Sequence, residues 1–227
     1  MNRQVKKFVK LCPNISHTNL MIATFSEENF HELCDSLAKK DKHLKRILHQ
    51  HGYPPMWRRK PNFETLIHII LEQQVSLASA KAALNKLKEK IGGITPKKLL
   101  ALTDTEMKAC YFSRQKIIYA RHLASSIVNG ELSIKKLNGL LDDEIRNELK
   151  KIKGIGDWTV DVFLLMALQR TNIFPTGDLA MINSLKKVKQ LSTNITKEEI
   201  IVIAESWKPH RSIATMILWH SYLEERK

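Results

Sequence analysis

Two closely spaced glycines between two helical patterns constrain this chain more than any other feature. Apolar residues recur at helical spacing before Gly154 and again after Gly156. Glycine permits a positive φ angle and lets the backbone approach another molecule closely. Asp157 follows at once and is a favourable N-cap for the next helix. The segment from about residue 142 to residue 168 is therefore predicted to form a helix, a glycine hairpin and a second helix.

This hairpin would end at the N-terminus of a helix, where unpaired N–H groups and the helix dipole favour an anion. In DNA the matching anion is a backbone phosphate, and contact with it carries no sequence information. The predicted contact residues are Lys151, Lys153, Gly154, Ile155 and Gly156. The alternative is an αα-hairpin with a glycine turn and no ligand, and any single lysine is ordinarily part of a solvated charged face.

The charge of the whole chain favours a nucleic-acid partner. The 227 residues include 37 Lys and Arg against 23 Asp and Glu, which gives a formal net charge of +14. A sequence pI of about 9.7 suits a polyanionic partner, although a merely basic protein shares this property.

The sequence also argues against several classes of protein. It contains no apolar run long enough to span a bilayer and no apolar core of a signal peptide, so we expect no membrane partner. Cys12, Cys34 and Cys110 are odd in number and widely spaced, which argues against disulfides, a zinc site and an iron–sulfur cluster. We expect no metal centre and a monomer in a reducing cytoplasm, associated with the nucleoid if the source is bacterial.

The rest of the chain is predicted to form helices separated by caps and turns. Helices are expected at about residues 26–40, 41–52, 63–72, 76–91, 113–129, 179–187 and 212–220, with capping boxes at 103–106 and 196–199. Only residues 1–25 are ambiguous, as a short strand or an extended arm. The predicted fold class is all-α, with roughly ten helices and one or two lobes.

A lone carboxylate follows the hairpin unit. Asp178 ends the run Phe-Pro-Thr-Gly-Asp that begins at Phe174. Its position after Gly177 is typical of a helix N-cap, and an N-cap role is compatible with a chemical one.

Several stretches, taken in order, resemble the helix–hairpin–helix DNA glycosylase superfamily, and within it the alkylation-repair glycosylases of the 3-methyladenine type. The similar stretches are residues 55–80, 111–124, 151–160, 174–185 and 207–219. Their order along the chain is far more specific than any single stretch. The resemblance implies a two-lobed helical bundle with a cleft between the lobes. We expect one domain over residues 26–227, with one lobe at about 62–170 and the other formed by about 26–61 and 171–227.

The resemblance also implies the roles of three side chains. It makes Asp178 the essential carboxylate, which suits a reaction whose transition state develops positive charge on a sugar. It makes Trp158 and Trp219 the walls of a pocket for a base flipped out of the duplex. An alkylated purine is cationic, so an indole face attracts it. A core role is the alternative for both tryptophans, and Trp57 and Trp207 are interpreted as structural.

Further DNA contacts are expected at a turn between two helices. Gln73 and Gln74 should face the minor groove, where Gln74 would fill the gap left by the flipped nucleotide. Two exposed glutamines near a helix cap are the alternative. Arg211 is expected either to contact a phosphate or to support the helix that follows it.

Two positions refine the expected reaction. Bifunctional relatives carry a lysine for Schiff-base chemistry just after the hairpin, where this chain has Trp158. Some relatives carry a tyrosine one turn later, where this chain has Val162, so its base preference stays open. The sequence thus predicts a monofunctional glycosylase acting on double-stranded DNA with damaged bases. No cofactor is required, and a monovalent cation at the hairpin stays an open alternative.

Two other functions stay open at this point. One is a glycosylase for another class of lesion, such as oxidised or deaminated bases. The other is a non-catalytic protein that binds damaged DNA through the same hairpin. Asp178 distinguishes the last of these, because a carboxylate near the DNA backbone would only repel phosphate in a pure binder.

Overall fold

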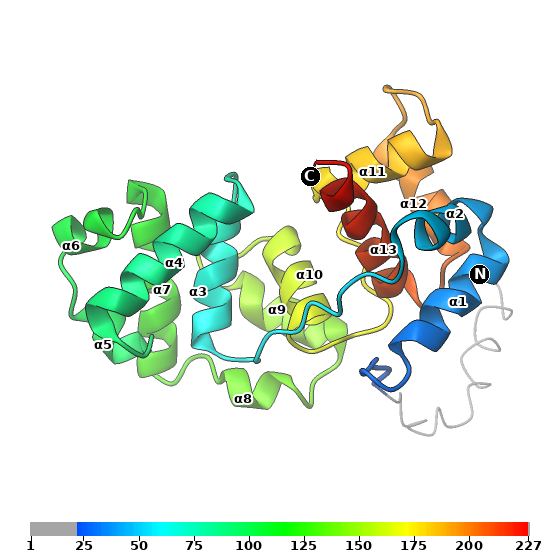
Figure 1. The fold of residues 1–227 in the computed structure, drawn as a ribbon. Helices are drawn as coiled ribbons and strands as arrows, with labels where there is room; N and C mark the ends of the chain where they lie inside the picture. The colour runs from blue at the N-terminus through cyan, green and yellow to red at the C-terminus, as the bar shows by residue number, and fades with distance from the viewer. Residues whose placement is uncertain (1–21, 227) are drawn as a thin grey trace, which may run out of the picture.

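The computed structural model describes residues 22–226 of the chain (Figure 1). These residues form thirteen α-helices and no strand, apart from an isolated antiparallel bridge between Thr24 and Arg170. The predicted all-α class is confirmed. The sequence suggested only about ten helices because α5, α6 and α8 span four to six residues, too few for an apolar period to be recognised.

One group of helices combines the beginning and the end of the described chain (Figure 1). α13 packs against α1, α2 and α11, and α1 also packs against α2. The group contains α1 (Phe30–Lys40), α2 (Lys42–His51), α11 (Leu179–Lys189), α12 (Lys197–Glu205) and α13 (Arg211–Glu224).

The second group is formed by the middle of the chain. α3 packs against α4, α7 and α10, while α7 also packs against α5 and α6, and α9 packs against α10. This group contains α3 (Phe63–Glu72), α4 (Leu77–Ile91), α5 (Pro96–Leu100), α6 (Asp104–Ala109), α7 (Arg114–Val128), α8 (Ile134–Leu137), α9 (Asp142–Lys150) and α10 (Asp157–Met166).

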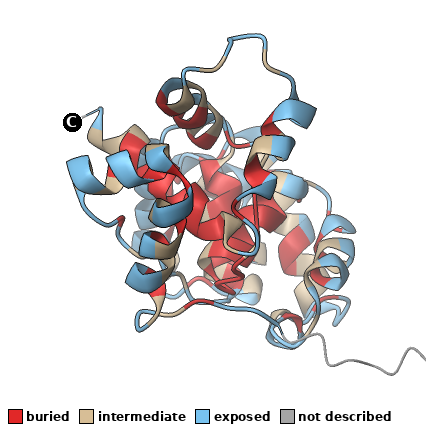
Figure 2. Ribbon diagram, turned by 90° about the vertical axis from the view of Figure 1, so that its right-hand side faces the viewer, coloured by how far each residue is buried: buried red, intermediate tan, exposed pale blue. Residues whose placement is uncertain are grey.

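The chain passes between the two groups twice, through residues 52–62 and residues 167–178 (Figure 1). Buried residues lie in the middle of the molecule, and exposed residues cover the outer helix faces (Figure 2). The helices α3, α10 and α13 contribute long runs of buried residues to this core. The expected lobe boundaries, at about 62–170 and at about 26–61 with 171–227, stay a prediction.

Most of the helix starts suggested by the sequence are capped as expected. The side chains that accept a backbone N–H at an N-terminus are Asp41, Asn62, Ser76, Thr95, Thr103, Ser113, Asp178 and Thr196. The helix expected from Ser26 begins instead at Phe30. The reason is a local turn, because the N–H of Ser26 donates to Oδ1 of Asn29 at 2.8 Å and holds residues 26–29 outside the helix.

The arm predicted for residues 1–25 falls largely outside the described residues. Its described end is attached to the segment between the two groups. The N–H of Phe25 donates to the carbonyl of Gln169 at 2.9 Å, and the N–H of Thr171 donates to that of Ala23 at 3.1 Å. The ring of Phe25 is buried in the core. Within residues 22–226, no helix combines the length and the apolar character needed to cross a membrane.

Candidate active site and nucleic-acid interface

Asp178 lies where the two groups of helices meet. It is the N-cap of α11, and its Oδ1 accepts the N–H of Met181 at 2.8 Å. The residue is only 8% exposed, so its carboxylate is largely withdrawn from water. A buried carboxylate requires hydrogen-bond donors, because an unpaired buried charge is strongly unfavourable. The local N-cap alone satisfies only part of that requirement.

Two tryptophans supply the other donors. Nε1 of Trp158 in α10 donates to Oδ2 of Asp178 at 2.9 Å, and Nε1 of Trp219 in α13 donates to Oδ1 at 2.9 Å. The two indoles come from different groups of helices, so the carboxylate is held across their boundary. Trp219 is buried, whereas Trp158 is half-buried and keeps part of its surface accessible.

The indoles thus have a contact that the sequence did not suggest. The sequence predicts them as base-pocket walls, with a core role as the alternative, and the structure adds two hydrogen bonds that orient the carboxylate. Trp57, which we interpreted as structural, packs edge-on against Trp219 with ring centroids 6.3 Å apart. No sequence pattern indicated that Trp57 belongs to this aromatic cluster, because it lies 162 positions from Trp219 in the chain.

Within residues 22–226, the carboxylate of Asp178 has no cationic partner. All three donors, the amide of Met181 and the indoles of Trp158 and Trp219, are neutral N–H groups. Among residues 22–226 no lysine, arginine or histidine forms an ion pair with this carboxylate. The carboxylate is therefore oriented without being neutralised, so its field remains available to a positive charge placed beside it.

The predicted glycine hairpin is present between α9 and α10. Gly154 has a φ angle of +92°, and a Cβ atom at this position would lie 2.0 Å from Cγ of Tyr119. Glycine is thus required twice, by the left-handed backbone and by the Tyr119 ring packed on it. Ile155 is buried and its N–H donates to the carbonyl of Ile152 at 3.0 Å. Tyr119 lies outside the sequence motif and was not predicted.

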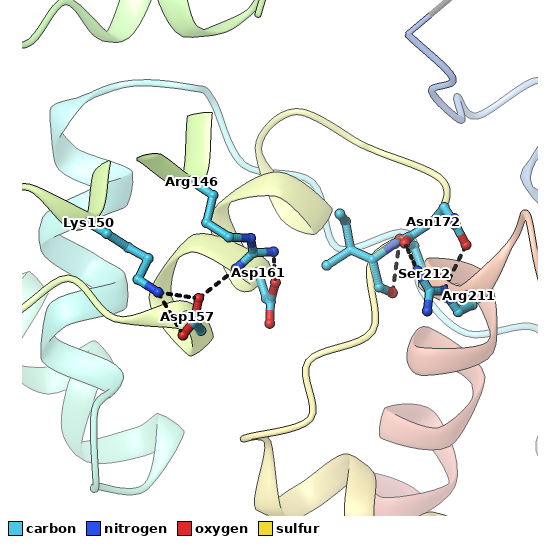
Figure 3. Close-up of polar contacts among 8 residues, drawn as sticks. Arg146, Lys150, Asp157, Asp161, Asn172, Arg211 and Ser212 are labelled. Carbon is cyan, nitrogen blue, oxygen red and sulfur yellow. Dashed lines mark hydrogen bonds and ion pairs between the residues drawn. The ribbon is translucent and has the colours of Figure 1, made fainter. Parts of the chain in front are cut away.

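The helix after the hairpin begins one residue earlier than expected. Its N-cap is Gly156 rather than Asp157, and no side chain in the described part of the chain caps its first N–H groups. Asp157 is instead the first residue of α10 and forms ion pairs with Lys150 at 2.9 Å and Arg146 at 3.1 Å (Figure 3). The hydrogen bond from Lys150 is the main reason that the pKa of Asp157 is lowered. The first turn of α10 therefore keeps unsatisfied N–H groups, beside an aspartate whose charge is paired.

Arg146 also joins the hairpin helices internally. Its guanidinium bonds to Asp161, which is buried, at 2.6 Å (Figure 3). Burial raises the pKa of Asp161, and the bond from Arg146 opposes that rise. The pair fixes α9 against α10 on the two sides of the hairpin. No sequence pattern predicted that Arg146 and Asp161 would form an ion pair, because each reads only as a charged residue of its own helix.

The turn between α3 and α4 lies against this hairpin. Nε2 of Gln73 donates to the carbonyl of Gly154 at 2.9 Å and to Oγ1 of Thr159 at 3.0 Å. The side chain of Gln73 is therefore used inside the protein rather than toward a groove. Gln74 is exposed and has a φ angle of +58°, a backbone conformation that is uncommon for residues other than glycine. Of the two predicted glutamines, only Gln74 faces outward.

The remaining predicted cations differ in how they are used. Lys151 and Lys153 are exposed, and Lys151 forms an ion pair with Glu148 at 2.6 Å. Nε of Arg211 donates to Oδ1 of Asn172 at 2.8 Å, and Nη2 donates to the Asn172 carbonyl at 3.1 Å (Figure 3). Arg211 thus supports the start of α13, which is one of the two roles considered for it.

The comparison with known proteins identifies the family. Residues 67–210 match the model of the HhH-GPD superfamily base excision DNA repair protein, which is more than half of the chain. The chain belongs to this superfamily. It is 30% identical over 210 residues to DNA-3-methyladenine glycosylase 1 of Schizosaccharomyces pombe, a match that covers 86% of this chain and 92% of that protein.

Solved structures agree with the family. The 3-methyladenine DNA glycosylase of Schizosaccharomyces pombe in complex with abasic DNA superimposes with a TM-score of 0.77 at 28% identity, covering 83% of this chain and 95% of that chain. A DNA-3-methyladenine glycosidase of Bacillus halodurans gives a TM-score of 0.68 at 26% identity, covering 84% and 88%. The predicted resemblance and the helix–hairpin–helix fold are confirmed. The residue roles are not tested by these matches.

Proposed function

We propose that this protein is a monofunctional DNA glycosylase of base excision repair that hydrolyses the N-glycosyl bond of alkylated purines and leaves an abasic site. Family membership and the similarity to DNA-3-methyladenine glycosylases support a hydrolase of this type. The observation that carries the proposal is the Asp178 carboxylate, which is buried, held by neutral donors and free of any cationic partner among the described residues.

Such a carboxylate suits the cleavage of a glycosidic bond. As the bond between base and sugar breaks, positive charge develops on the sugar ring. Asp178 would lie against that ring, stabilise the charge and orient or deprotonate the attacking water. Its orientation is set in advance by Trp158 and Trp219, so little reorganisation is required during the reaction.

The substrate class follows from the aromatic cluster. Alkylated purines such as 3-methyladenine and 7-methylguanine carry a positive charge and are already good leaving groups. An accessible indole attracts such a base by about 0.5–2 kcal/mol more than a neutral one. Trp158, which is half-buried, is the best candidate for this wall. Val162 is buried within α10, so the position where some relatives have a tyrosine contributes packing instead.

The absence of a lysine at the hairpin position argues for simple hydrolysis. A bifunctional enzyme forms a Schiff base between a lysine amine and the sugar. Here the corresponding residue is Trp158, whose N–H is already bonded to Asp178. We propose that water is the only nucleophile and that no cofactor is required. A monovalent cation at the hairpin carbonyls stays a prediction.

The hairpin is proposed to hold the backbone of the damaged strand. The uncapped N–H groups at the start of α10 would bind a phosphate, with Lys151 and Lys153 adding positive charge. A Cβ atom at Gly156 would meet no protein atom within 4 Å, so packing inside the protein does not require this glycine. Close approach of a phosphate explains it. Gln74 would fill the gap in the duplex.

Contact with phosphates predicts a strong dependence on salt. The logarithm of the binding constant should fall by about 0.9 per neutralised phosphate for each tenfold rise in salt concentration. We propose that the protein acts as a monomer on double-stranded DNA in the cytoplasm, at the nucleoid if the source is bacterial.

The first test is release of free bases from methylated duplex DNA under single-turnover conditions. Wild-type protein should release 3-methyladenine or 7-methylguanine and leave the strand intact until alkali is added. Asp178→Asn should release either base about a thousandfold more slowly while still binding DNA. Asp41→Asn is the matched control, because Asp41 is also a buried N-cap bonded to a tryptophan but lies away from the hairpin.

Three results would contradict the proposal in different ways. Strand cleavage before alkali treatment would show a bifunctional enzyme. Release of oxidised or deaminated bases alone would assign another class of lesion. Tight binding to damaged DNA without release of any base would indicate a non-catalytic binder.

A further inference from the structure

An exposed carboxylate lies at the proposed phosphate site of the hairpin. Asp157 is the first residue of α10, and its side chain is 62% exposed. A phosphate bound to the uncapped N–H groups of this turn would lie next to Asp157, and two negative charges repel each other. The proposed function alone gives no reason for an acidic residue at this position.

The side chains of α9 hold this carboxylate. Nζ of Lys150, the last residue of α9, donates to Oδ1 of Asp157 at 2.9 Å and to Oδ2 at 3.0 Å (Figure 3). Nη1 of Arg146, one turn earlier in α9, donates to Oδ1 of Asp157 at 3.1 Å. Both cations of α9 are therefore bonded to the same carboxylate, beside the hairpin.

The two cations differ in what else holds them. The Arg146 side chain is 27% exposed and also bonds to the buried carboxylate of Asp161 at 2.6 Å, so its position is fixed inside the protein. The Lys150 side chain is 43% exposed, and within residues 22–226 its ammonium group bonds to Asp157 alone. A lysine also has a flexible stem and three donors that rotate freely. Lys150 can therefore change its partner, whereas Arg146 keeps its buried one.

An exchange of partner costs little free energy at this position. An ion pair between exposed side chains contributes little to stability, because water screens both charges and the long side chain loses entropy. A DNA phosphate carries a negative charge, as the carboxylate does, and accepts hydrogen bonds from an ammonium group in the same way. A phosphate at the hairpin and the carboxylate of Asp157 thus compete for one ammonium group, that of Lys150.

We infer that Asp157 binds Lys150 in the free protein and gives it up to a backbone phosphate when duplex DNA binds. The inference rests on the proposed function, because it assumes that the hairpin holds a DNA phosphate. Lys150 thereby adds one phosphate contact to those proposed for Lys151 and Lys153. Asp157 lowers the affinity of the hairpin for any duplex, so it limits how tightly the enzyme is held on undamaged DNA and on its own product.

The first measurement is the affinity for undamaged duplex DNA at one fixed salt concentration, by fluorescence anisotropy. Asp157→Asn keeps the shape of the side chain and removes the charge that holds Lys150. It should bind about fivefold more tightly than wild type, the fold-change that corresponds to the upper range for one exposed ion pair.

Asp104→Asn is the matched control for this variant. Asp104 is the first residue of α6, its side chain is 66% exposed, and it pairs with Arg121 at 2.7 Å. It thus resembles Asp157 in position, exposure and partner, but α6 lies at the outer end of the second group of helices (Figure 1). The affinity of Asp104→Asn for DNA should equal that of wild type.

Lys150→Gln distinguishes an exchange of partner from simple repulsion of phosphate by Asp157. This variant should bind DNA more weakly than wild type, and its salt dependence should fall by about 0.9 in slope, the value for one phosphate contact. Combined with Asp157→Asn it should lose most of the fivefold gain, because no ammonium group is left to release. Lys135→Gln changes an exposed lysine of α8, before the start of α9, and should keep the wild-type slope.

Three results would overturn the inference. They are equal affinities of wild type and Asp157→Asn, a full fivefold gain in the double variant, and an unchanged salt slope in Lys150→Gln. A purely structural role of Asp157 predicts the opposite sign, because a variant with a loosened hairpin would bind DNA more weakly and unfold at a lower denaturant concentration.

Base release from methylated duplex is measured separately on the same proteins. If wild type releases no base but Asp157→Asn binds duplex more tightly, the proposed glycosylase activity fails and the inference stands. If wild type releases a base and Asp157→Asn binds no more tightly, only the inference fails. If wild type does not bind duplex DNA, both fail.

Discussion

Two aspartates in this molecule have nearly the same local structure and opposite electrostatic settings. Asp41 is the N-cap of α2 and Asp178 the N-cap of α11, and each is 8% exposed. Each accepts a hydrogen bond of 2.9 Å from a tryptophan Nε1, Asp41 from Trp207. The difference lies in the next partner, because Asp41 also accepts from the ammonium group of Lys189 at 2.6 Å.

The comparison shows a partner that the structural carboxylate has and that the proposed catalytic carboxylate lacks. Asp41 joins α2 to α11 and to Trp207, and its charge is neutralised by Lys189 within that contact. Asp178 receives a second indole, from Trp158, in place of a cation. A neutral donor fixes the position of the carboxylate and leaves its negative charge effective. This contrast supports a chemical role for Asp178 independently of the family.

The largest expected effect is a crossed result for the two aspartates. Asparagine caps a helix as well as aspartate, so Asp178→Asn should keep the fold and lower base release by about a thousandfold, the upper range for loss of one preorganised electrostatic group. Asp41→Asn should leave catalysis unchanged and lower the free energy of unfolding by about 2–3 kcal/mol, because a buried ion pair is broken. Denaturant unfolding and single-turnover rates, measured on both proteins, check this.

The prediction requires that the loss of rate occurs only in Asp178→Asn and the loss of stability only in Asp41→Asn. Loss of stability without loss of rate in Asp178→Asn would remove the distinction between the two sites. An equal loss of rate in Asp41→Asn, at a temperature where it is fully folded, would do the same.

The helix N-caps in this comparison could be predicted from the sequence, whereas the contacts between distant residues could not. An N-cap role for Asp178 followed from its neighbours, because capping depends on residues that are adjacent in the chain. Its contact with Trp219 joins residues 41 positions apart, and the contact of Asp41 with Trp207 spans 166 positions. Such pairs arise from packing of whole helices, for which one sequence gives no period or spacing. Trp57 and Tyr119 were missed for the same reason.

The hairpin shows the same limit on a smaller scale. Its glycines and flanking helices were predicted, because backbone freedom and apolar spacing are local properties. The hydrogen bonds of the Gln73 side chain inside the protein could not be predicted, because its partners Gly154 and Thr159 lie more than 80 positions away. A polar residue at a turn gives the same sequence signal whether it faces a ligand or another turn.

A smaller effect is expected from the tryptophans that hold each carboxylate. Trp207→Phe removes one N–H donor from the buried Asp41 and should lower the free energy of unfolding by about 2 kcal/mol, typical of a hydrogen bond to a charged group. Trp158→Phe keeps an aromatic ring but removes a donor to Asp178, so the rate of base release should fall by about tenfold. Stability should change less in Trp158→Phe, because Trp158 is only half-buried. The same unfolding and single-turnover assays compare the pair, and a rate unaffected by Trp158→Phe would show that its N–H does not orient Asp178.

The smallest effect is a pH dependence that belongs to Asp41. Burial tends to raise the pKa of this carboxyl, but the bonds from Lys189 and Trp207 outweigh burial and leave the pKa below its ordinary value. The unfolded chain therefore binds a proton more readily than the folded one near pH 4, the ordinary range for aspartate being about 3.9. Stability from Asp41 is fully present above that pH and is lost as the pH falls through the lowered pKa. The difference in unfolding free energy between wild type and Asp41→Asn should thus be constant from pH 7 to about 5 and shrink below pH 4. Lys189→Met removes the cation and should weaken this pH dependence. If the difference in unfolding free energy between wild type and Asp41→Asn grows as the pH falls, burial dominates and Asp41 is not stabilised as an ion.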